Sequence, residues 1–326
     1  MSAPSVPQSS QVIEEAPRTY WLDSERFLSI VMLSPAAVYV LLLVGIPFVL
    51  AILFAFSDVT VGDPTLDHFT LDTFQRVLTD PNFQRALSNN VVFTLISQAI
   101  MVVLANVLAV ALTRNFPGKW FVRFLILLPW ATPIAIGAIG WLWMFDSVYS
   151  PIDWIFRNLG LLKQIGVTGQ VGILKNATNM YWLGEPGLAM FSVILVQIWR
   201  MLPMSTVIIM AGLTSISPDI RDAVQIDGVG WWREWREVTL PLLRPILLVA
   251  MLFGIIFTFT DMTVVYVLTR GGPPPNTTQV LASWAFIKGI QSGNLSEGAA
   301  TVMFMLPVLL GVALVMLRIA RRTEVS

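Results

Sequence analysis

Six long apolar stretches alternate with more polar connections along the 326 residues of the chain. Each stretch is long enough to cross a bilayer as a helix, which takes about 20 residues. Backbone groups in hydrocarbon need internal hydrogen bonds, and the stretches lack the alternating pattern of barrel strands. The pattern therefore predicts an all-α integral membrane protein with transmembrane helices at residues 27–56, 88–113, 121–145, 187–214, 244–269 and 294–318.

The connections between these spans indicate how the chain is oriented. If the N-terminus is cytoplasmic, most of the 20 Lys and Arg residues fall in cytoplasmic tails and loops, and fewer fall in the longer outer loops 57–87 and 146–186. The positive-inside rule then predicts that both termini are cytoplasmic. Residues 1–26 are polar and lack the features of a signal peptide, so we expect a cytoplasmic tail with an interfacial segment before a transmembrane domain at 27–326.

Composition supports the membrane class and excludes several kinds of site. The chain is 56% hydrophobic and 12% charged, its net charge is +0, and its mean hydropathy is +0.73. This balance gives no reason to expect a nucleic-acid partner. The chain has no cysteine, so disulfides and thiolate metal sites are excluded, and its single histidine, His68, cannot form a histidine cluster. We expect no metal site.

The third apolar stretch is interrupted by residues that disturb a regular helix. Its sequence, LPWATPIAIGAIGWLWMF, contains Pro129, Pro133, Gly137 and Gly140. Such breaks are tolerated in a membrane where neighbouring helices or cavity water satisfy the freed carbonyl groups. The pattern fits either a helix that bends around a pathway or a kinked helix that only packs.

Residues 217–240 form a polar interruption with helical patterns on both sides of a Gly-Val-Gly sequence. Ser217 is a good N-cap and Pro218 suits the first helical position, so a short helix is expected to start here. Gly228 and Gly230 can adopt positive φ values and predict a turn. The segment is therefore expected to be a helical hairpin outside the bilayer.

The second helix of this hairpin is expected to present one aromatic side. Pro241 and Pro245 are expected to separate it from the next span, because proline disfavours helical backbone in the residue before it. One interpretation is an interfacial hairpin whose indoles lie at the headgroup level. The residues on this side are Trp231, Trp232, Trp235 and Val238.

The sequence DAVQIDGVGWWREWREVTLPLLRP resembles the EAA loop of permease subunits in binding-protein-dependent ABC importers. It departs from that pattern mildly, with Asp222 in place of Glu, Val224 in place of the second Ala, and Val229 in place of Ala. The positions that match the loop, and to which the resemblance assigns ATPase coupling, are Asp222, Ala223, Asp227, Gly228, Trp235, Leu240 and Pro241.

Three further stretches extend the resemblance over about residues 30–320, and it is greatest to the maltose/glycerol-phosphate permease group. QIWRMLPMSTVIIMAGLTSISPDI is similar to the segment before the loop in sugar permeases. TDMTVVYVLTRGGPPPNTTQV is similar to the signature after the fifth span, with Thr260 and Arg270 as departures. SPIDWIFRNLGLL is similar to the outer loop that follows the third span.

The resemblance implies the six-helix fold of a type I ABC importer permease in a bacterial or archaeal cytoplasmic membrane. It implies a second related permease, two cytoplasmic ATPase subunits that bind ATP and Mg, and an extracellular sugar-binding protein or lipoprotein. The cargo would be a carbohydrate, with a di- or oligosaccharide favoured and a glycerol-phosphate-like or other polyol as the alternative. The chain itself would hold no cofactor.

Other functional classes find less support in the residues. The chain has no GxxxxGK[ST] phosphate-binding motif, and His68 has no partners that would make a hydrolase site. We therefore expect a transport subunit and not an enzyme. A secondary carrier stays open as an alternative, although its coupling ions would favour more carboxylates inside the membrane.

Two charged residues lie within the predicted spans, Arg200 in the fourth and Asp261 in the fifth. A charge near mid-membrane costs on the order of 2.5–3.5 kcal/mol on insertion scales, so each needs a reason. Either the two pair or cap broken backbone, or they line a sugar pathway together with Gln197. A sugar site needs a few polar groups among apolar and aromatic walls, for which the candidates are Trp141, Trp143, Trp199 and Trp284.

Overall fold

The computed structural model describes residues 24–66, 68–166 and 177–324, and within these ranges the chain forms helices and no strand. The chain divides into two compact units, Met1–Ala51 and Ile52–Ser326. Most of the predicted tail at residues 1–26 lies outside the described residues. Helix α1 (Glu25–Val40) lies in the first unit and continues through a π-helical turn (Leu41–Gly45) into α2 (Ile46–Ala55), within which the boundary between the units falls.

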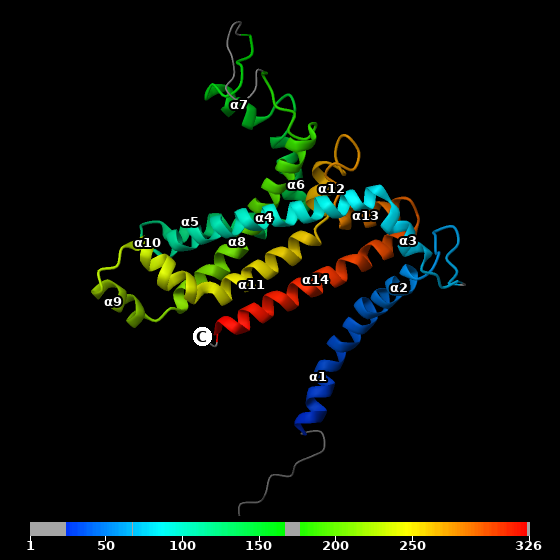
Figure 1. Ribbon diagram of the computed structural model, residues 1–326, viewed down its shortest axis with the longest axis horizontal. Helices are drawn as coiled ribbons and strands as arrows, with labels where there is room; N and C mark the ends of the chain where they lie inside the picture. Colours follow the sequence, from blue (N-terminus) through cyan, green and yellow to red (C-terminus); the bar gives the residue numbers. More distant parts are fainter. Residues whose placement is uncertain (1–23, 67, 167–176, 325–326) are drawn as a thin grey trace, which may run out of the picture. The chain divides into compact units, whose positions relative to one another are not determined.

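Four long helices run side by side in the second unit (Figure 1). They are α4 (Pro81–Thr113), α8 (Pro186–Ser215), α11 (Leu240–Phe259) and α14 (Leu295–Glu324). Helix α4 packs along α8, and α11 packs against the other three. By length and composition, the described residues contain five helices able to cross a membrane, or six if the bent pair below forms one span. The predicted all-α membrane architecture is confirmed.

Three apolar clusters hold this unit together. One lies next to the hairpin, where the ends of α4 and α8 meet the start of α11 through Ala109, Leu213 and Leu243. A second lies at the opposite end around Phe83 and Phe259. The third contains residues of α4 and α8, among them Phe93 and Val193. It joins these helices to the parts of the chain around Phe145, Trp182, Val264 and Val280.

The third predicted span is broken in two. Helix α5 (Lys119–Ala131) and helix α6 (Ile134–Met144) meet at an angle of 98° at Thr132–Pro133. Pro133 has no N–H to continue the helix, and Thr132 before it takes extended backbone, as residues that precede proline prefer. Helix α5 packs along α8, whereas α6 packs against the short helix α12 (Thr263–Leu268). The change is a sharp bend and not a mild kink.

The fifth predicted span, 244–269, is wrong at both of its ends. The helix runs without interruption from Trp231 to Phe259, through α10 (Trp231–Glu234), a π-helical turn (Trp235–Thr239) and α11. The π turn closes with a bond from the Leu240 N–H to the Trp235 carbonyl. This wider turn lies directly before Pro241, and it gives the proline ring room that a regular helix lacks.

Shorter helices complete the connections. Helix α3 (Asp72–Thr79) lies in the predicted outer loop 57–87, and α7 (Pro151–Asn158) lies in the loop 146–186. After Phe259 the chain forms α12, a loop, α13 (Leu281–Phe286) and a π-helical turn (Ile287–Gln291). Residues 260–269 were predicted as the end of the fifth span, but they belong to the connection that follows it. This connection packs against the bundle.

Candidate functional site

The hairpin at residues 217–240 folds as its sequence predicts. Helix α9 (Pro218–Ile226) begins where the Asp219 N–H donates to the Ser217 hydroxyl at 3.3 Å. The chain then turns at Gly228, whose φ is +63°. Gly230 differs from the prediction, because its φ is −66° and its extended backbone forms the N-cap of α10. Only the first glycine of the turn needs the left-handed region.

The residues expected to contact an ATPase fall into two groups. Asp222, Ala223, Asp227 and Gly228 are all exposed on α9 and the turn. The other three, which are half-buried where α10 joins α11, are Trp235, Leu240 and Pro241. The first group is therefore accessible at the surface, whereas the second lies where the hairpin joins the bundle. Their coupling role stays a prediction.

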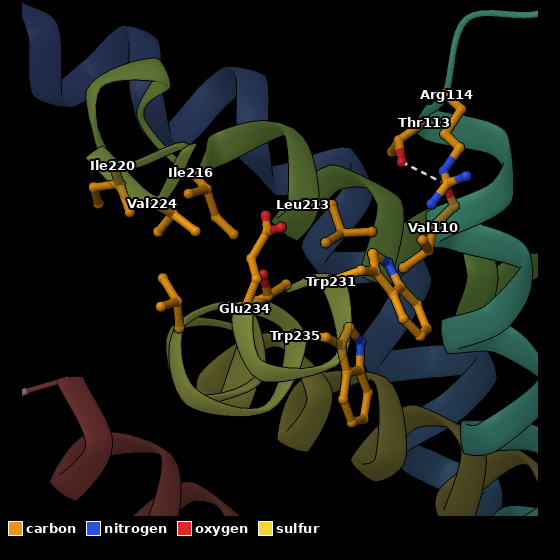
Figure 2. Close-up of a pocket in the computed structure, with 12 residues that line it drawn as sticks. Val110, Thr113, Arg114, Leu213, Ile216, Ile220, Val224, Trp231, Glu234 and Trp235 are labelled. Carbon is orange, nitrogen blue, oxygen red and sulfur yellow. Dashed lines mark hydrogen bonds between the residues drawn. The ribbon is translucent and has the colours of Figure 1, made fainter. Parts of the chain in front are cut away.

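A cavity of about 250 Å³ separates α9 from the rest of the bundle (Figure 2). Ile220 and Val224 reach it from α9, and Glu234 reaches it from α10. No described cation forms an ion pair with Glu234. Helix α9 therefore borders the cavity through apolar side chains, and Glu234 is the carboxylate that faces them from α10.

Arg200 and Asp261 form an ion pair that joins α8 to the chain after α11. The Asp261 side chain is 6% exposed and that of Arg200 is 24% exposed. Asp261 lies in the break between α11 and α12, where it also accepts the Val264 N–H at 3.0 Å. Both parts of the structural interpretation are therefore observed: the two charges pair, and the carboxylate caps broken backbone.

Gln197 and Trp284, two further pathway candidates, are enclosed by the chain itself. Gln197 has no exposed surface and donates to the Thr258 hydroxyl at 3.1 Å. Trp284 is 7% exposed, and the Lys288 ammonium lies 5.1 Å from the centre of its ring. In this conformation both side chains pack within the protein. A role on the sugar pathway stays a prediction for these two residues and for Arg200 and Asp261.

The aromatic residues proposed as walls are not gathered in one place. Trp141 packs edge-on against Trp199, with 5.6 Å between the ring centroids. Trp143, two residues along α6, is 76% exposed and faces outward. Together with the buried Trp284, this arrangement gives no single aromatic-lined chamber within the described chain.

A row of polar residues on α4 was missed from the sequence. Asn90, Thr94 and Gln98 recur every four residues and are at most 3% exposed. Asn90 donates to the Phe259 carbonyl and accepts the Leu281 N–H, both at 3.3 Å, and so links α4 to the end of α11 and to α13. The four-residue spacing within an apolar helix was the available signal.

A charged cluster near α13 also went unpredicted. The Lys288 ammonium lies 3.1 Å from a Glu297 oxygen and 3.3 Å from an Asp80 oxygen. Burial acts to lower the pKa of Lys288, but hydrogen bonds and charges from Glu297 and Asp80 outweigh it and the pKa is raised. The cluster fastens the start of α4 to the start of α14, and Asp80 lies more than 200 positions from the other two residues, so its part in the cluster depends on the fold.

The profile of the family described as "Binding-protein-dependent transport system inner membrane component" matches residues 101–325, which include the hairpin and both members of the ion pair. The chain belongs to this family. The resemblance seen in the sequence is thereby confirmed. The family description is that of a membrane component of a transport system, which supports a subunit that is not itself an enzyme.

Several named permease proteins are similar to this chain over nearly its whole length. It is 28% identical over 315 residues to the sulfoquinovosyl glycerol transport system permease protein SmoG of Agrobacterium fabrum, covering 95% of this chain and 96% of that protein. It is 27% identical over 297 residues to the trehalose/maltose transport system permease protein MalF of Thermococcus litoralis (91% and 95%). It is also 27% identical over 298 residues to the diacetylchitobiose uptake system permease protein DasB of Streptomyces coelicolor (90% and 86%).

Solved structures show the same fold. A chain of a bacterial ABC transporter that imports the acidic polysaccharide alginate superposes with a TM-score of 0.72 at 19% identity, covering 93% of this chain and 98% of that chain. A second structure of a bacterial alginate transporter, in complex with a periplasmic protein that holds an alginate pentasaccharide, also gives a TM-score of 0.72. The fold of this chain is thus that of an ABC importer permease.

Proposed function

We propose that this chain is the membrane-spanning permease subunit of an ATP-driven importer for a carbohydrate. The cargo is a di- or oligosaccharide that an extracellular binding protein delivers and that is released into the cytoplasm of a bacterium or archaeon. A second, related permease completes the pathway. Two cytoplasmic ATPase subunits bind ATP and Mg, and this chain supplies neither an ATP site nor a cofactor.

The observation that carries the proposal is the exposed hairpin and its attachment. Helix α9 presents Asp222 and Ala223 outward and lies over a cavity. The next helix, Trp231–Phe259, runs without a break from the turn into the bundle. A push on the hairpin therefore acts on one continuous helix, whose far end at Phe259 lies two residues before Asp261 of the Arg200–Asp261 pair. Closure of the ATPases would act through this helix and shift the population between two arrangements of the bundle.

The cargo class rests on the relatives. Their names specify diacetylchitobiose, trehalose or maltose, and sulfoquinovosyl glycerol, all of which carry many hydroxyl groups. A site for such a cargo needs a few placed polar groups among apolar walls, and the two permease subunits would form it together. A glycerol-phosphate-like or other polyol has related chemistry and is one outcome of the following test.

The importer is tested with the co-encoded binding protein and the assembled complex. The binding protein is exposed to a mixture of sugars and polyols, and the retained compound is identified by mass spectrometry. We expect a di- or oligosaccharide that, together with the binding protein, stimulates ATP hydrolysis by the complex in liposomes. Retention of a polyol would change the cargo and keep the importer. Uptake driven by an ion gradient without ATP would identify a secondary carrier and contradict the proposal.

The proposed orientation has a test of its own, because the chain contains no cysteine. With both termini cytoplasmic, a cysteine introduced at Ser292 is expected to react with an impermeant reagent on intact cells. One introduced at Thr323 is expected to react only after the cells are opened. The reverse pattern of labelling would invert the topology and place the hairpin on the wrong side for an ATPase.

A further inference from the structure

An open groove of about 750 Å³ follows the half of α4 that lies next to the hairpin. Its volume falls within the range of about 300–1,000 Å³ that is typical of ligand sites. Its walls are almost entirely apolar, and the polar lining residue Asn106, which is 8% exposed, donates its amide to the Val102 carbonyl of its own helix at 2.8 Å. The lining residues that the argument uses are Val103, Val107, Arg114, Trp231, Trp232 and Trp235.

The groove has the length of one bilayer leaflet. Val103 and Val107 are 61% and 62% exposed, so this face of α4 needs an apolar cover. From Val103 to Arg114 the chain rises by about 16 Å at 1.5 Å per residue. The hydrocarbon of a bilayer is about 30 Å thick, so this distance is about half of it. An acyl chain that fills the groove would extend from the membrane surface to the middle of the bilayer.

A cation stands at the surface end of the groove. Lys119 and Arg123, the next two basic residues, already donate to carbonyl groups at the end of α4, to Thr113 at 3.5 Å and to Leu112 at 2.8 Å. They therefore complement the negative end of that helix. Arg114 is exposed, and no carboxylate of the described chain forms an ion pair with it. Its charge is available to a ligand.

Three indoles frame the same end. Trp232 stacks on Trp235, with 5.4 Å between ring centroids and 17° between ring planes, and Trp231 lies beside Trp232. Tryptophans gather at the headgroup level of membranes, where the ring is apolar and the N–H finds a polar acceptor. Trp231, Trp235 and Arg114 also line the cavity beneath α9 (Figure 2), so a ligand held here would touch the base of the hairpin.

We propose that the groove binds an anionic phospholipid from the leaflet next to the hairpin. The acyl chain lies along α4 against Val103 and Val107, and the phosphate is held by Arg114 among the indole N–H groups. A protein segment could fill the apolar part of the groove. A phospholipid matches the whole groove better, because the groove has the length of one leaflet and ends at Arg114, which has no ion-pair partner in the described chain and lies among tryptophans. The proposal does not depend on the cargo.

The test compares lipid retention by variants of the assembled complex. Native mass spectrometry would follow phosphatidylglycerol and phosphatidylcholine with identical chains, and inorganic phosphate as a soluble probe. We expect wild type to retain phosphatidylglycerol in preference to phosphatidylcholine and not to retain phosphate alone. Arg114→Gln is expected to weaken retention of phosphatidylglycerol roughly fivefold, from about 1 kcal/mol per basic residue at an anionic surface. Val107→Trp, which fills the groove, is expected to abolish it.

Two matched variants serve as controls. Arg322→Gln removes the same charge from an exposed position at the end of α14, and Val92→Trp places the same bulk on an exposed position of α4 outside the groove. Both are expected to retain the lipid as wild type does. Equal retention by all four variants would overturn the proposal. Efficient cross-linking of a cysteine at Val107 to the partner permease would also overturn it, and would identify the groove as a subunit interface.

Discussion

Replacing Arg200 by alanine is expected to lower the yield and thermal stability of folded protein severely. The change leaves Asp261, whose side chain is 6% exposed, without its cation. Removing one partner of a buried ion pair commonly costs about 3–5 kcal/mol, because an uncompensated charge stays in a medium of low dielectric constant. The yield from membranes and the melting temperature of the purified complex would measure the loss.

A second substitution at Asp261 should restore much of this loss. Arg200→Ala combined with Asp261→Asn removes both charges and keeps a side-chain oxygen for the Val264 N–H. Arg200→Ala combined with Asp261→Ala also removes both charges but leaves that buried N–H without its acceptor, so its rescue should be smaller by about the 1–3 kcal/mol of an unsatisfied buried group. The order of the three variants separates the contribution of charge from that of the helix cap.

A functional role for the pair would give a different result. If Arg200 and Asp261 bind cargo directly, the single variants should fold as well as wild type and lose sugar-stimulated ATP hydrolysis, and the double variants should not recover it. Equal melting temperatures for wild type and Arg200→Ala would contradict the structural role. Loss of stability with rescue would confirm that the pair fastens α8 to the break after α11.

The sequence predicted the elements whose signals are local. The long apolar stretches predicted α8 to within one residue at each end, and the end of α4 and the start of α14 equally well. Helix α4 starts seven residues earlier than expected, and α14 ends six residues later. Ser217 and Gly228 predicted the start of α9 and its turn, because an N-cap and a positive φ depend on neighbouring residues only.

The errors come from places where packing overrides a local rule. Pro241 is a poor residue for a helix interior, yet a π-helical turn accommodates it and the helix continues. The apolar stretch that contains Asp261 predicts one uninterrupted span. The helix instead breaks at Asp261, because the carboxylate pairs with Arg200 and accepts an N–H at the start of α12. Neither outcome could be inferred without knowing which side chains the neighbouring helices bring close.

The candidate site was predicted in part for the same reason. The hairpin was recognised because its residues are contiguous and match a family pattern, and the pairing of Arg200 with Asp261 was one of two stated alternatives. The row of Asn90, Thr94 and Gln98 and the Lys288 cluster depend on contacts between distant segments. The lipid groove has no sequence signature, since it is formed mainly by residues of α4 and of the helix Trp231–Phe259, which lie more than 100 positions apart.

The hairpin should prove sensitive at Gly228 and tolerant at Gly230. A Cβ at either position meets no atom within 4 Å, so neither substitution creates a clash inside the chain. They differ in backbone, because φ is +63° at Gly228 and −66° at Gly230. Leucine at Gly228 strains the turn by about 1–2 kcal/mol, whereas Gly230 already has a conformation that leucine adopts freely.

We expect Gly228→Leu to separate transport from folding. The residue is exposed at the tip of the hairpin, so the membrane helices should insert and the protein should be produced at wild-type levels. The distorted turn moves α9, and the new side chain adds bulk to the surface offered to the ATPase. Recovery of the ATPase subunits with the purified complex, and sugar-stimulated ATP hydrolysis, should both fall at least tenfold, which corresponds to a loss of about 1.4 kcal/mol. Gly230→Leu is the matched control and should retain both.

Asp222 gives an independent test of the same surface. It is exposed on α9, at the position where the EAA pattern that this loop resembles has a glutamate, and we expect its carboxylate to meet a basic group on the ATPase. Asp222→Arg reverses the charge and should prevent association, because like charges brought together at an interface cost several kcal/mol. Asp222→Glu keeps the charge and should associate normally. If Gly228→Leu and Asp222→Arg both retained ATPase binding and sugar-stimulated hydrolysis, the hairpin would be only an interfacial anchor, and the proposed coupling through the Trp231–Phe259 helix would be wrong.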